Sequence, residues 1–300
     1  MQRLAPACGS RGRGGVEPLT SVRDTTPVGS EPNTEADARG PPPYLSSILA
    51  EALREGTERR LLDLIRANPV PRHLGLIMDG NRRFAEAHGL FVGQGHREGK
   101  DKLEELLDWC LEVGIRILTV FALSTENLDR SPEEVAELMD LFVDSFRQVA
   151  RDERVHRHHI RVRAIGNLDR LRPDVVEAIR LAETATQGYS DYAFNIAIAY
   201  GGREEIVQAI RRLATQVAAG KIRPDEIDDR KVSENLYTAD LPDPDLVLRT
   251  SGEERISNFL LWQAAYAELY FADVMWPGLT KTDFLRAIRA FQLRRRNFGK

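Results

Sequence analysis

Six short apolar runs, separated by segments with helical periodicity, constrain the fold of this chain more than any other feature. The first two, Leu74–Met78 and Ile115–Leu123, are almost entirely apolar, which is typical of strands covered on both faces. The others are Ile160–Ile165, Tyr192–Tyr200, Asp245–Arg249 and Glu268–Phe271. Strands that alternate with helices predict an α/β fold, namely a single domain with a central, mainly parallel six-stranded sheet flanked by helices.

Clusters of polar residues follow four of these runs directly. Parallel sheets bind their ligands beyond the carboxyl ends of the strands. We therefore expect the clusters to share one edge of the sheet and to form one site. They are numbered here as first Asp79–Arg83, second Ser124–Arg130, third Arg249–Arg255 and fourth Gly201–Arg203.

The first cluster has the composition of a diphosphate site. Asp79, Gly80 and Asn81 form a turn between the first strand and a helix that begins at Arg82. Gly80 lets the backbone approach a ligand closely, and the N-terminus of the helix favours an anion. Arg82 and Arg83 offer planar donors that match phosphate oxygens, and Asp79 is a hard oxygen ligand suited to Mg²⁺. The plainer alternative is a capped turn with two solvated arginines.

Two further clusters carry related chemistry. Ser124–Arg130 offers hydroxyls, an amide and a guanidinium, although a strand-to-helix loop with capping side chains has the same composition. Arg249, Arg255 and Ser257 surround a glycine and make a second credible diphosphate cradle. Ser257 is also placed to cap a helix that the pattern predicts over Ser257–Ala264.

Two stretches outside these clusters contain residue types that can bind a metal, and each has another interpretation. Glu268 stands in an aromatic, apolar segment, where an unpaired carboxylate would be costly to bury. It therefore needs a metal, an arginine or a hydrogen-bond donor as a partner. The histidines of Val155–His159 have no regularly spaced cysteine or carboxylate beside them, so a solvated helix end is the better interpretation.

Composition argues against several classes of function. The formal net charge of −4 provides no basic field, so nucleic acid is not an expected partner. Cys8 and Cys110 lie far apart and indicate no disulfide framework, which fits a reducing cytoplasm. No run of about 18 apolar residues is present, so no membrane-spanning helix is expected. The glycine-rich stretch Gly93–Lys100 follows no strand and lacks the spacing of a nucleotide-binding loop.

The first part of the chain differs from the rest. Residues 1–43 hold seven of the fifteen prolines and almost nothing that could pack into a core, so disorder is predicted there. Residues 44–70 predict a helical lead-in, either as one long helix or as two short ones divided at Gly56. Residues 71–300 contain no linker-like stretch and are expected to form the single functional domain.

Three long blocks of this sequence resemble the cis-prenyltransferase family, of which undecaprenyl diphosphate synthase is the best-known member. The resemblance runs from about Pro71 to the C-terminus, and agreement over such long blocks is specific. The aspartate-rich motif of trans-prenyltransferases is absent, since Asp228 and Asp229 are followed by Arg-Lys-Val. The blocks are His73–Ala85, Ser124–Glu134 and Asp245–Phe271.

The resemblance implies a role for each matching residue. Asp79 would bind Mg²⁺ and assist departure of the allylic diphosphate, Glu268 would be the second metal-associated carboxylate, and Asn127 would take part in proton removal. Phe84 and Leu128 stand where long-chain members usually have tryptophan. The residues implied to bind substrates are Gly80, Asn81, Arg82, Arg83, Phe84 and His96 for the allylic diphosphate, Ser124, Thr125, Glu126, Leu128 and Arg130 over the reacting carbons, and Arg249, Arg255, Ile256 and Ser257 for isopentenyl diphosphate.

The resemblance also implies the reaction. A homodimeric, Mg²⁺-dependent enzyme of the cytoplasm would condense isopentenyl diphosphate with an allylic prenyl diphosphate and form a cis (Z) prenyl diphosphate. Peripheral contact with a membrane during product release is a further expectation. The alternative is a catalytically silent partner subunit of a heteromeric cis-prenyltransferase. Such subunits lose the first-block aspartate and arginines, whereas Asp79, Arg83, Arg249 and Glu268 all remain here.

A growing hydrocarbon needs a dry tunnel. The helical segment Val135–Val149 and the strand Ile115–Leu123 supply suitable walls, although both patterns are also typical of an ordinary core. Product length stays open: Ala122 occupies a position where small residues tend to permit longer products, whereas Arg82 and the helical lead-in resemble short-chain members. Val92 stands where an arginine is common, so one phosphate contact lacks its usual residue.

Overall fold

The computed structural model describes residues 43–294. The disorder predicted for residues 1–43 therefore concerns residues that, except for Pro43, lie outside the described part of the chain. Helix α1 (Pro43–Arg66) is continuous, which decides the alternatives for the lead-in in favour of one long helix. Its last turn packs on the core through Ile65, which is fully buried, and Gln292 donates a hydrogen bond to the Ile65 carbonyl oxygen at 3.0 Å. The described residues from Ser47 onward belong to one compact unit.

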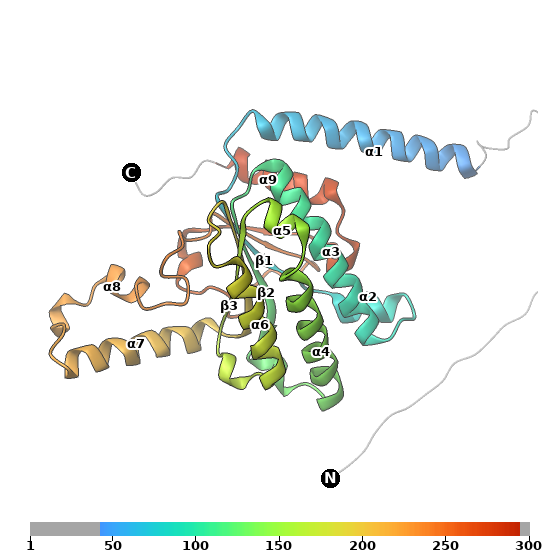
Figure 1. The fold of residues 1–300 in the computed structure, drawn as a ribbon. Helices are drawn as coiled ribbons and strands as arrows, with labels where there is room; N and C mark the ends of the chain where they lie inside the picture. The colour runs from blue at the N-terminus through green and yellow to red at the C-terminus, as the bar shows by residue number, and fades with distance from the viewer. Residues whose placement is uncertain (1–42, 295–300) are drawn as a thin grey trace, which may run out of the picture. The chain divides into compact units, whose positions relative to one another are not determined.

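All six predicted strands are present in one sheet (Figure 1). The strand order is β3-β4-β2-β1-β5-β6, and each neighbouring pair runs parallel, so the predicted α/β class is confirmed. Each strand lies within two residues of its predicted bounds. The strands are β1 (His73–Ile77), β2 (Ile117–Ser124), β3 (Ile160–Ile165), β4 (Tyr192–Tyr200), β5 (Leu246–Arg249) and β6 (Glu268–Phe271).

The register brings the polar clusters to one edge of the sheet. Ile77, the last residue of β1, lies beside Phe121 of β2 and beside Arg249 of β5. Ser124 at the end of β2 pairs with Tyr200 at the end of β4. Because the strands are parallel, the residues that follow them leave the sheet on the same side. The expectation of a shared edge is therefore confirmed.

Both faces of the sheet are covered, as the continuous apolar runs predicted. Leu74 and Leu76 of β1 belong to a large core that includes side chains of α3, α4, α6 and α9, whereas Ile77 and Phe259 belong to a smaller core. Alternate side chains of a strand point to opposite faces, so a strand of this kind must be apolar throughout. The remaining helices are α2 (Asn81–Ala87), α3 (Val92–Val113), α4 (Pro132–Val149), α5 (Glu153–Arg157), α6 (Pro173–Thr186), α7 (Gly202–Ala218), α8 (Asp229–Ser233) and α9 (Lys281–Leu293).

Capping residues mark several helix ends. The Ser131 hydroxyl accepts a hydrogen bond from the Glu134 N–H, and Pro132 occupies the first position of α4. Gly114, with a φ of 85°, ends α3 in the left-handed conformation. Within residues 43–294, no helix combines the length and the apolar character needed to cross a membrane. Cys110 is buried and free in α3, and Cys8 lies outside the described residues.

The helix predicted over Ser257–Ala264 is wrong. Ser257, Asn258 and Leu260 have φ values of 46°, 65° and 44°, which a right-handed helix excludes. Only a short 3-10 turn, Gln263–Tyr266, follows. The cause is tertiary: Phe259 and Leu260 are both fully buried in the smaller core, and consecutive buried side chains on an irregular loop override the helical pattern.

Candidate active site

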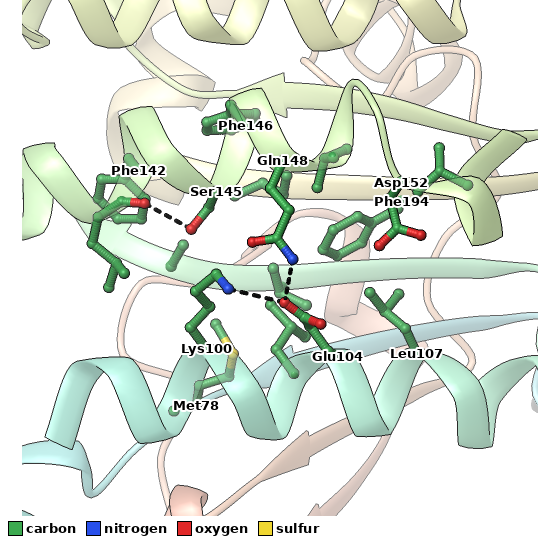
Figure 2. Close-up of a pocket in the computed structure, with 18 of the residues that line it drawn as sticks. Met78, Lys100, Glu104, Leu107, Phe142, Ser145, Phe146, Gln148, Asp152 and Phe194 are labelled. Atoms are coloured by element: carbon green, nitrogen blue, oxygen red, sulfur yellow. Dashed lines mark hydrogen bonds and ion pairs between the residues drawn. The ribbon is translucent and has the colours of Figure 1, made fainter. Parts of the chain in front are cut away.

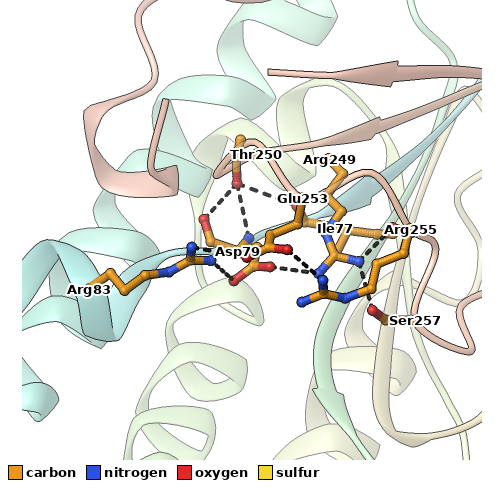
Figure 3. A network of polar contacts seen from close by, with 8 residues as sticks. All are labelled: Ile77, Asp79, Arg83, Arg249, Thr250, Glu253, Arg255 and Ser257. Carbon is orange, nitrogen blue, oxygen red and sulfur yellow. Dashed lines mark hydrogen bonds and ion pairs between the residues drawn. The ribbon is translucent and has the colours of Figure 1, made fainter. Parts of the chain in front are cut away.

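Asp79 lies at the centre of a charged network at the carboxyl end of β1 (Figure 3). Its Oδ2 accepts a hydrogen bond from Arg249 Nη2 at 2.6 Å, and its Oδ1 accepts one from Arg83 Nη2 at 3.2 Å. Thr250 is fully buried and holds the turn, because its hydroxyl accepts from the Asp79 N–H at 2.9 Å and donates to the Asp79 carbonyl oxygen at 2.7 Å. The structure thus joins the first and third clusters through one carboxylate.

Arg249 is almost completely buried in this network, with 3% of its surface exposed. Its Nη1 donates to the Ser257 hydroxyl at 2.7 Å and to the Arg255 carbonyl oxygen at 2.5 Å. Its Nε–H has no hydrogen-bond partner among the described residues. A buried guanidinium is stable only when its donors are satisfied, so the free Nε–H indicates a place for an anion's oxygen.

Glu253 holds two arginines at the exposed side of the network. One of its oxygens accepts from Arg83 Nη1 at 3.2 Å, and the other accepts from Arg255 Nη1. The side chains of Arg83 and Arg255 are 44% and 60% exposed. Exposed ion pairs contribute little free energy, so both arginines can exchange Glu253 for a phosphate at small cost. The sequence pattern pointed to the arginines and missed Glu253.

Two glycines bring backbone segments close together here. Gly80 has a φ of 106°, and a Cβ at this position would lie 3.0 Å from Met275 Cβ and 3.0 Å from Ser251 Oγ. A Cβ on Gly99 of α3 would lie 2.3 Å from the Asn81 side-chain oxygen. That oxygen is buried and accepts no hydrogen bond from the described residues. The turn therefore requires glycine for packing, and Asn81 keeps an acceptor free at the site.

A second charged network lies beside the first and centres on Glu134 of α4. Its carboxylate accepts from Arg130 Nη1 at 2.8 Å and from Arg82 Nη2, and His96 Nε2 lies 3.4 Å from it. Burial by itself raises the pKa of Glu134, but the positive charges of Arg130 and Arg82 lower the pKa by a larger amount, so the net shift is downward. Burial also lowers the pKa of His96. The sequence analysis assigned roles to the three partners but none to Glu134.

The loop after β2 is held by hydrogen bonds within the second cluster. The Ser124 N–H donates to the Asn127 side-chain oxygen at 3.2 Å, and the Asn127 N–H donates to the Ser124 hydroxyl at 3.1 Å. The Thr125 hydroxyl donates to one oxygen of Glu126, and Asn258 Nδ2 donates to the other, each at 3.1 Å. Capping contacts of the plain loop interpretation are thus present, and Asn258 joins this loop to the third cluster.

The loop that carries Ser257 is strained. Ser251, Ser257, Asn258 and Leu260 account for four of the six described non-glycine residues with positive φ. Such conformations persist only where the surroundings hold them, and they gather at functional sites. Ser257 does not cap a helix, as the sequence pattern predicted, but accepts the hydrogen bond from Arg249.

An apolar pocket opens next to both networks (Figure 2). Met78, Asn81 and His96 line its end nearest to Asp79. It extends between α3, α4 and the sheet toward Ile160, the first residue of β3, and Phe194, the third residue of β4. The space between its lining atoms amounts to about 1160 Å³, part of it open to solvent. Its lining is mostly apolar with a few polar groups, which is typical of sites that bind small organic molecules.

The three apolar residues with predicted substrate contacts lie in different surroundings. The Phe84 ring stacks on His88 with 4.1 Å between the ring centres. Leu128 is partly buried against the large core, and Ile256 is partly buried against the smaller one. None of the three lines the pocket described above.

Within one chain, the structure does not bring Glu268 to Asp79. Glu268 begins β6 and pairs in register with Leu246, the first residue of β5, whereas Asp79 follows the end of β1. At about 3.3 Å per residue, these positions are separated by more than 10 Å along the strands. The Glu268 carboxylate instead accepts a hydrogen bond from Arg294 Nη1 at 2.8 Å, so the predicted need for a partner is met by an arginine. Two ligands of one Mg²⁺ must each lie near 2.1 Å from it, so a single chain cannot use both carboxylates.

The residues at Asp79 fit a metal that is bound together with a substrate. In the described part of the chain, no three histidine, cysteine or carboxylate side chains gather into a metal site. Mg²⁺, however, is commonly bound by one or two carboxylates plus substrate phosphates and waters. Asp79, with 26% of its side chain exposed and arginines on both sides, suits this second arrangement.

Comparison with known proteins agrees with this geometry. The sequence profile of a family described as putative undecaprenyl diphosphate synthase matches residues 77–299. The chain is 53% identical over 243 residues to the geranylgeranyl-diphosphate-specific tritrans,polycis-undecaprenyl-diphosphate synthase of Methanopyrus kandleri, covering 81% of this chain and 90% of that protein. It is 50% identical over 247 residues to the isoprenyl transferase of Thermus thermophilus, covering 81% and 94%.

A solved structure shares the fold. Lavandulyl diphosphate synthase from Lavandula x intermedia, determined in complex with dimethylallyl diphosphate, superposes with a TM-score of 0.74 at 38% identity. The match covers 77% of this chain and 99% of that one. With a family profile over most of the chain and relatives at about half identity, this chain belongs to the undecaprenyl diphosphate synthase family of cis-prenyltransferases.

Proposed function

We propose that this protein condenses isopentenyl diphosphate with an allylic prenyl diphosphate and forms a cis-prenyl diphosphate. The observation that carries the proposal is the position of Asp79 and Arg249 at the same edge of the sheet as the mouth of an apolar pocket. A prenyl diphosphate has a strongly anionic head and an apolar tail, so it needs both features together. The relatives named above are all prenyl diphosphate synthases or isoprenyl transferases by name.

The allylic diphosphate would bind at the first cluster. Asp79 would hold Mg²⁺ against its phosphates, and the bound metal would neutralise the charge of the departing diphosphate. Arg82 and Arg83 would donate to phosphate oxygens after leaving Glu134 and Glu253, and His96 would line the same group. Cations aimed at the leaving group lower the barrier to ionisation, because they stabilise charge that develops in the transition state.

Isopentenyl diphosphate would bind at the third cluster. Arg249 offers its free Nε–H, and Arg255 and Ser257 stand next to it. The alkene would then lie against the loop after β2, which includes Asn127. An amide oxygen is a poor base, so we expect Asn127 to orient the group that loses or takes the proton rather than to hold the proton itself.

The apolar pocket would receive the growing chain. Its walls are mostly aliphatic and aromatic side chains of α3, α4 and the sheet, and Ala122 is among them. An apolar wall excludes water, which would otherwise capture a carbocation before the alkene does. We also infer that so apolar a product is released through contact with a membrane surface.

We further propose a homodimer. Val207 and Ile210 of α7 are 44% and 55% exposed, and Tyr266, at the end of the 3-10 turn Gln263–Tyr266, is 79% exposed. Gln263 of the same turn donates to Glu205 of α7, so these apolar side chains belong to neighbouring elements. Exposed apolar side chains of adjacent elements are typical of a protein interface. The alternative of a silent partner subunit is less favoured, because Asp79, Arg83 and Arg249 are all present and both arginines donate hydrogen bonds to Asp79.

The test is a direct assay of the purified protein. It is incubated with labelled isopentenyl diphosphate, Mg²⁺ and, in turn, geranyl, farnesyl and geranylgeranyl diphosphate. We expect label in an extractable prenyl diphosphate with new cis double bonds, and none when the metal is chelated. Absence of product with every primer, from protein that is folded by circular dichroism, would contradict the proposal and favour the silent subunit.

A further inference from the structure

The wall of the apolar pocket is polar along one side. Lys100 and Glu104 of α3 meet Gln148 of α4 there (Figure 2). Arg154 of α5 completes the group through its hydrogen bond to Glu104. We call these four residues the polar seam. All four line the pocket, together with side chains that are mostly aliphatic or aromatic. The seam is therefore the part of the wall that joins α3 to α4 by hydrogen bonds and ion pairs.

Glu104 connects the other three residues of the seam. Its Oε1 accepts from Lys100 Nζ at 2.9 Å and from Gln148 Nε2 at 3.0 Å, and its Oε2 accepts from Arg154 Nη2 at 3.0 Å. Burial by itself raises the pKa of Glu104, but the hydrogen bonds from Lys100 and Arg154 lower it below its ordinary value. The carboxylate is therefore charged and uses both oxygens. Removing the Glu104 carboxylate would remove the hydrogen bond that joins Gln148 of α4 to α3.

Arg154 has other partners that do not depend on Glu104. Asp152 accepts from Arg154 Nη2 at 2.7 Å, and Asp108 lies 3.4 Å from its Nη1. Loss of Glu104 therefore leaves Arg154 paired, and Lys100 is free to extend into solvent. A substitution at Glu104 should open the seam without leaving a buried charge, so the fold is expected to tolerate it.

The apolar parts of the pocket wall are much less able to move. Val120 and Phe194 of the sheet and Leu138 and Phe146 of α4 are at most 5% exposed and belong to the large core. Close-packed cores resist displacement, because any shift creates cavities or overlaps. The side chains of Lys100, Glu104 and Arg154, in contrast, are 24%, 31% and 35% exposed. A chain that outgrows the pocket thus meets the least resistance at the seam.

We propose that Glu104 closes the seam and thereby limits the length of the prenyl chain that this enzyme makes. The inference rests on the proposed function and names a specificity-determining residue for it. A hydrocarbon that enters the intact seam must separate the contacts of Glu104 and offers no hydrogen bonds in return, which is unfavourable. Elongation therefore stops when the chain reaches the seam. Without Glu104, the gap between α3 and α4 accepts further isoprene units.

The experiment compares Glu104→Ala and Glu104→Gln with a matched control, Glu105→Ala. Glu105 is the next residue of α3, contacts Lys102 at 2.8 Å and does not line the pocket. Products from labelled isopentenyl diphosphate are separated by chain length at equal conversion, and total incorporation is measured alongside. We expect the main product of Glu104→Ala to be longer than that of the wild type by at least one isoprene unit. Glu104→Gln should lengthen the main product less, and the main product of Glu105→Ala should have the same length as that of the wild type.

Several results would overturn the inference. One is an unchanged or shorter product from folded Glu104→Ala, and another is an equal shift from Glu105→Ala. If Glu104→Ala fails to fold, Glu104→Gln, which keeps the shape and removes the charge, decides the question in the same way. A wild-type protein that makes no product would overturn the proposed function and this inference together. An active wild type with unshifted Glu104 variants would overturn only the inference.

Discussion

Two buried polar networks lie toward opposite ends of the same sheet, and they differ in how completely their atoms are paired. Toward the amino ends, His73 Nδ1 lies 2.7 Å from the Pro242 carbonyl oxygen and Nε2 lies 2.8 Å from the Thr119 hydroxyl. Asn195 donates a hydrogen bond to that hydroxyl, and Arg163 extends the network by donating hydrogen bonds to Asn195 and Asp240. A carbonyl oxygen only accepts, so His73 Nδ1 must carry the proton, and Nε2 then accepts from Thr119.

The network toward the carboxyl ends is incomplete. Arg249 Nε and the Asn81 side-chain oxygen have no partner among the described residues, although both are buried. Three arginines, Arg83, Arg249 and Arg255, surround Asp79 and Glu253, and two of them are exposed. A fully paired network stabilises one conformation, whereas unpaired buried donors and displaceable ion pairs are suited to a ligand. The comparison predicts that changes at one end affect activity and changes at the other affect stability.

The largest effect is expected from Asp79→Asn. The carboxamide keeps the shape and a hydrogen bond to Arg249 but removes the charge that would hold Mg²⁺, so turnover should fall by about 10³-fold or more. Steady-state kinetics measures the fall, and circular dichroism checks that the variant is folded. Retained turnover would remove Asp79 from the metal role.

The opposite end should show its effect in the pH dependence of stability. Burial lowers the pKa of His73 from 6.5 to about 4. The unfolded chain then binds more protons than the folded one between these values, so the contribution of His73 to the free energy of unfolding is complete above pH 6.5 and is lost as the pH falls toward 4. The loss is on the order of 3 kcal/mol.

Urea unfolding at about pH 7 and about pH 4.5 measures this loss, with His73→Gln as the comparison. The variant should be less pH-dependent than the wild type by most of that amount, and its turnover at neutral pH should be retained. An identical pH dependence in both proteins would show that His73 is not the group responsible.

A smaller effect is expected from Arg249→Lys. Lysine keeps the positive charge but cannot contact Asp79, Ser257 and a phosphate at once. The Michaelis constant for isopentenyl diphosphate should rise by about 30-fold, a loss of about 2 kcal/mol, and that for the primer should rise less. The reverse order would mean that the two diphosphate sites are exchanged.

The smallest effect is expected from Glu134→Gln. Its carboxylate orients Arg82 and Arg130, and an amide would hold them less firmly. Because Arg82 is 49% exposed, the loss should be no more than about 1 kcal/mol, or about fivefold in the Michaelis constant for the allylic primer. A change larger than that of Arg249→Lys would place Glu134 nearer to the chemistry than we infer.

Part of the site could be predicted from sequence because each cluster follows a strand. The positions of Asp79, Arg83 and Arg249 required only that the strands be parallel and adjacent. Glu134, Thr250 and Glu253 were missed as site residues, since a single acid or threonine in a loop or first helical turn has many ordinary explanations. Their importance comes from partners that are 38 to 171 residues away in the chain.

The sequence alone determined the strands, the direction of the sheet and the edge at which the polar clusters meet, because apolar runs, turns and helix caps are local patterns with a direct physical meaning. Tertiary structure decided what those patterns do not specify. Burial of Phe259 and Leu260 replaced a predicted helix with a strained loop, and the parallel register kept Glu268 away from Asp79 and next to Arg294. Both outcomes depend on which distant residues pack together, and no local pattern encodes that choice.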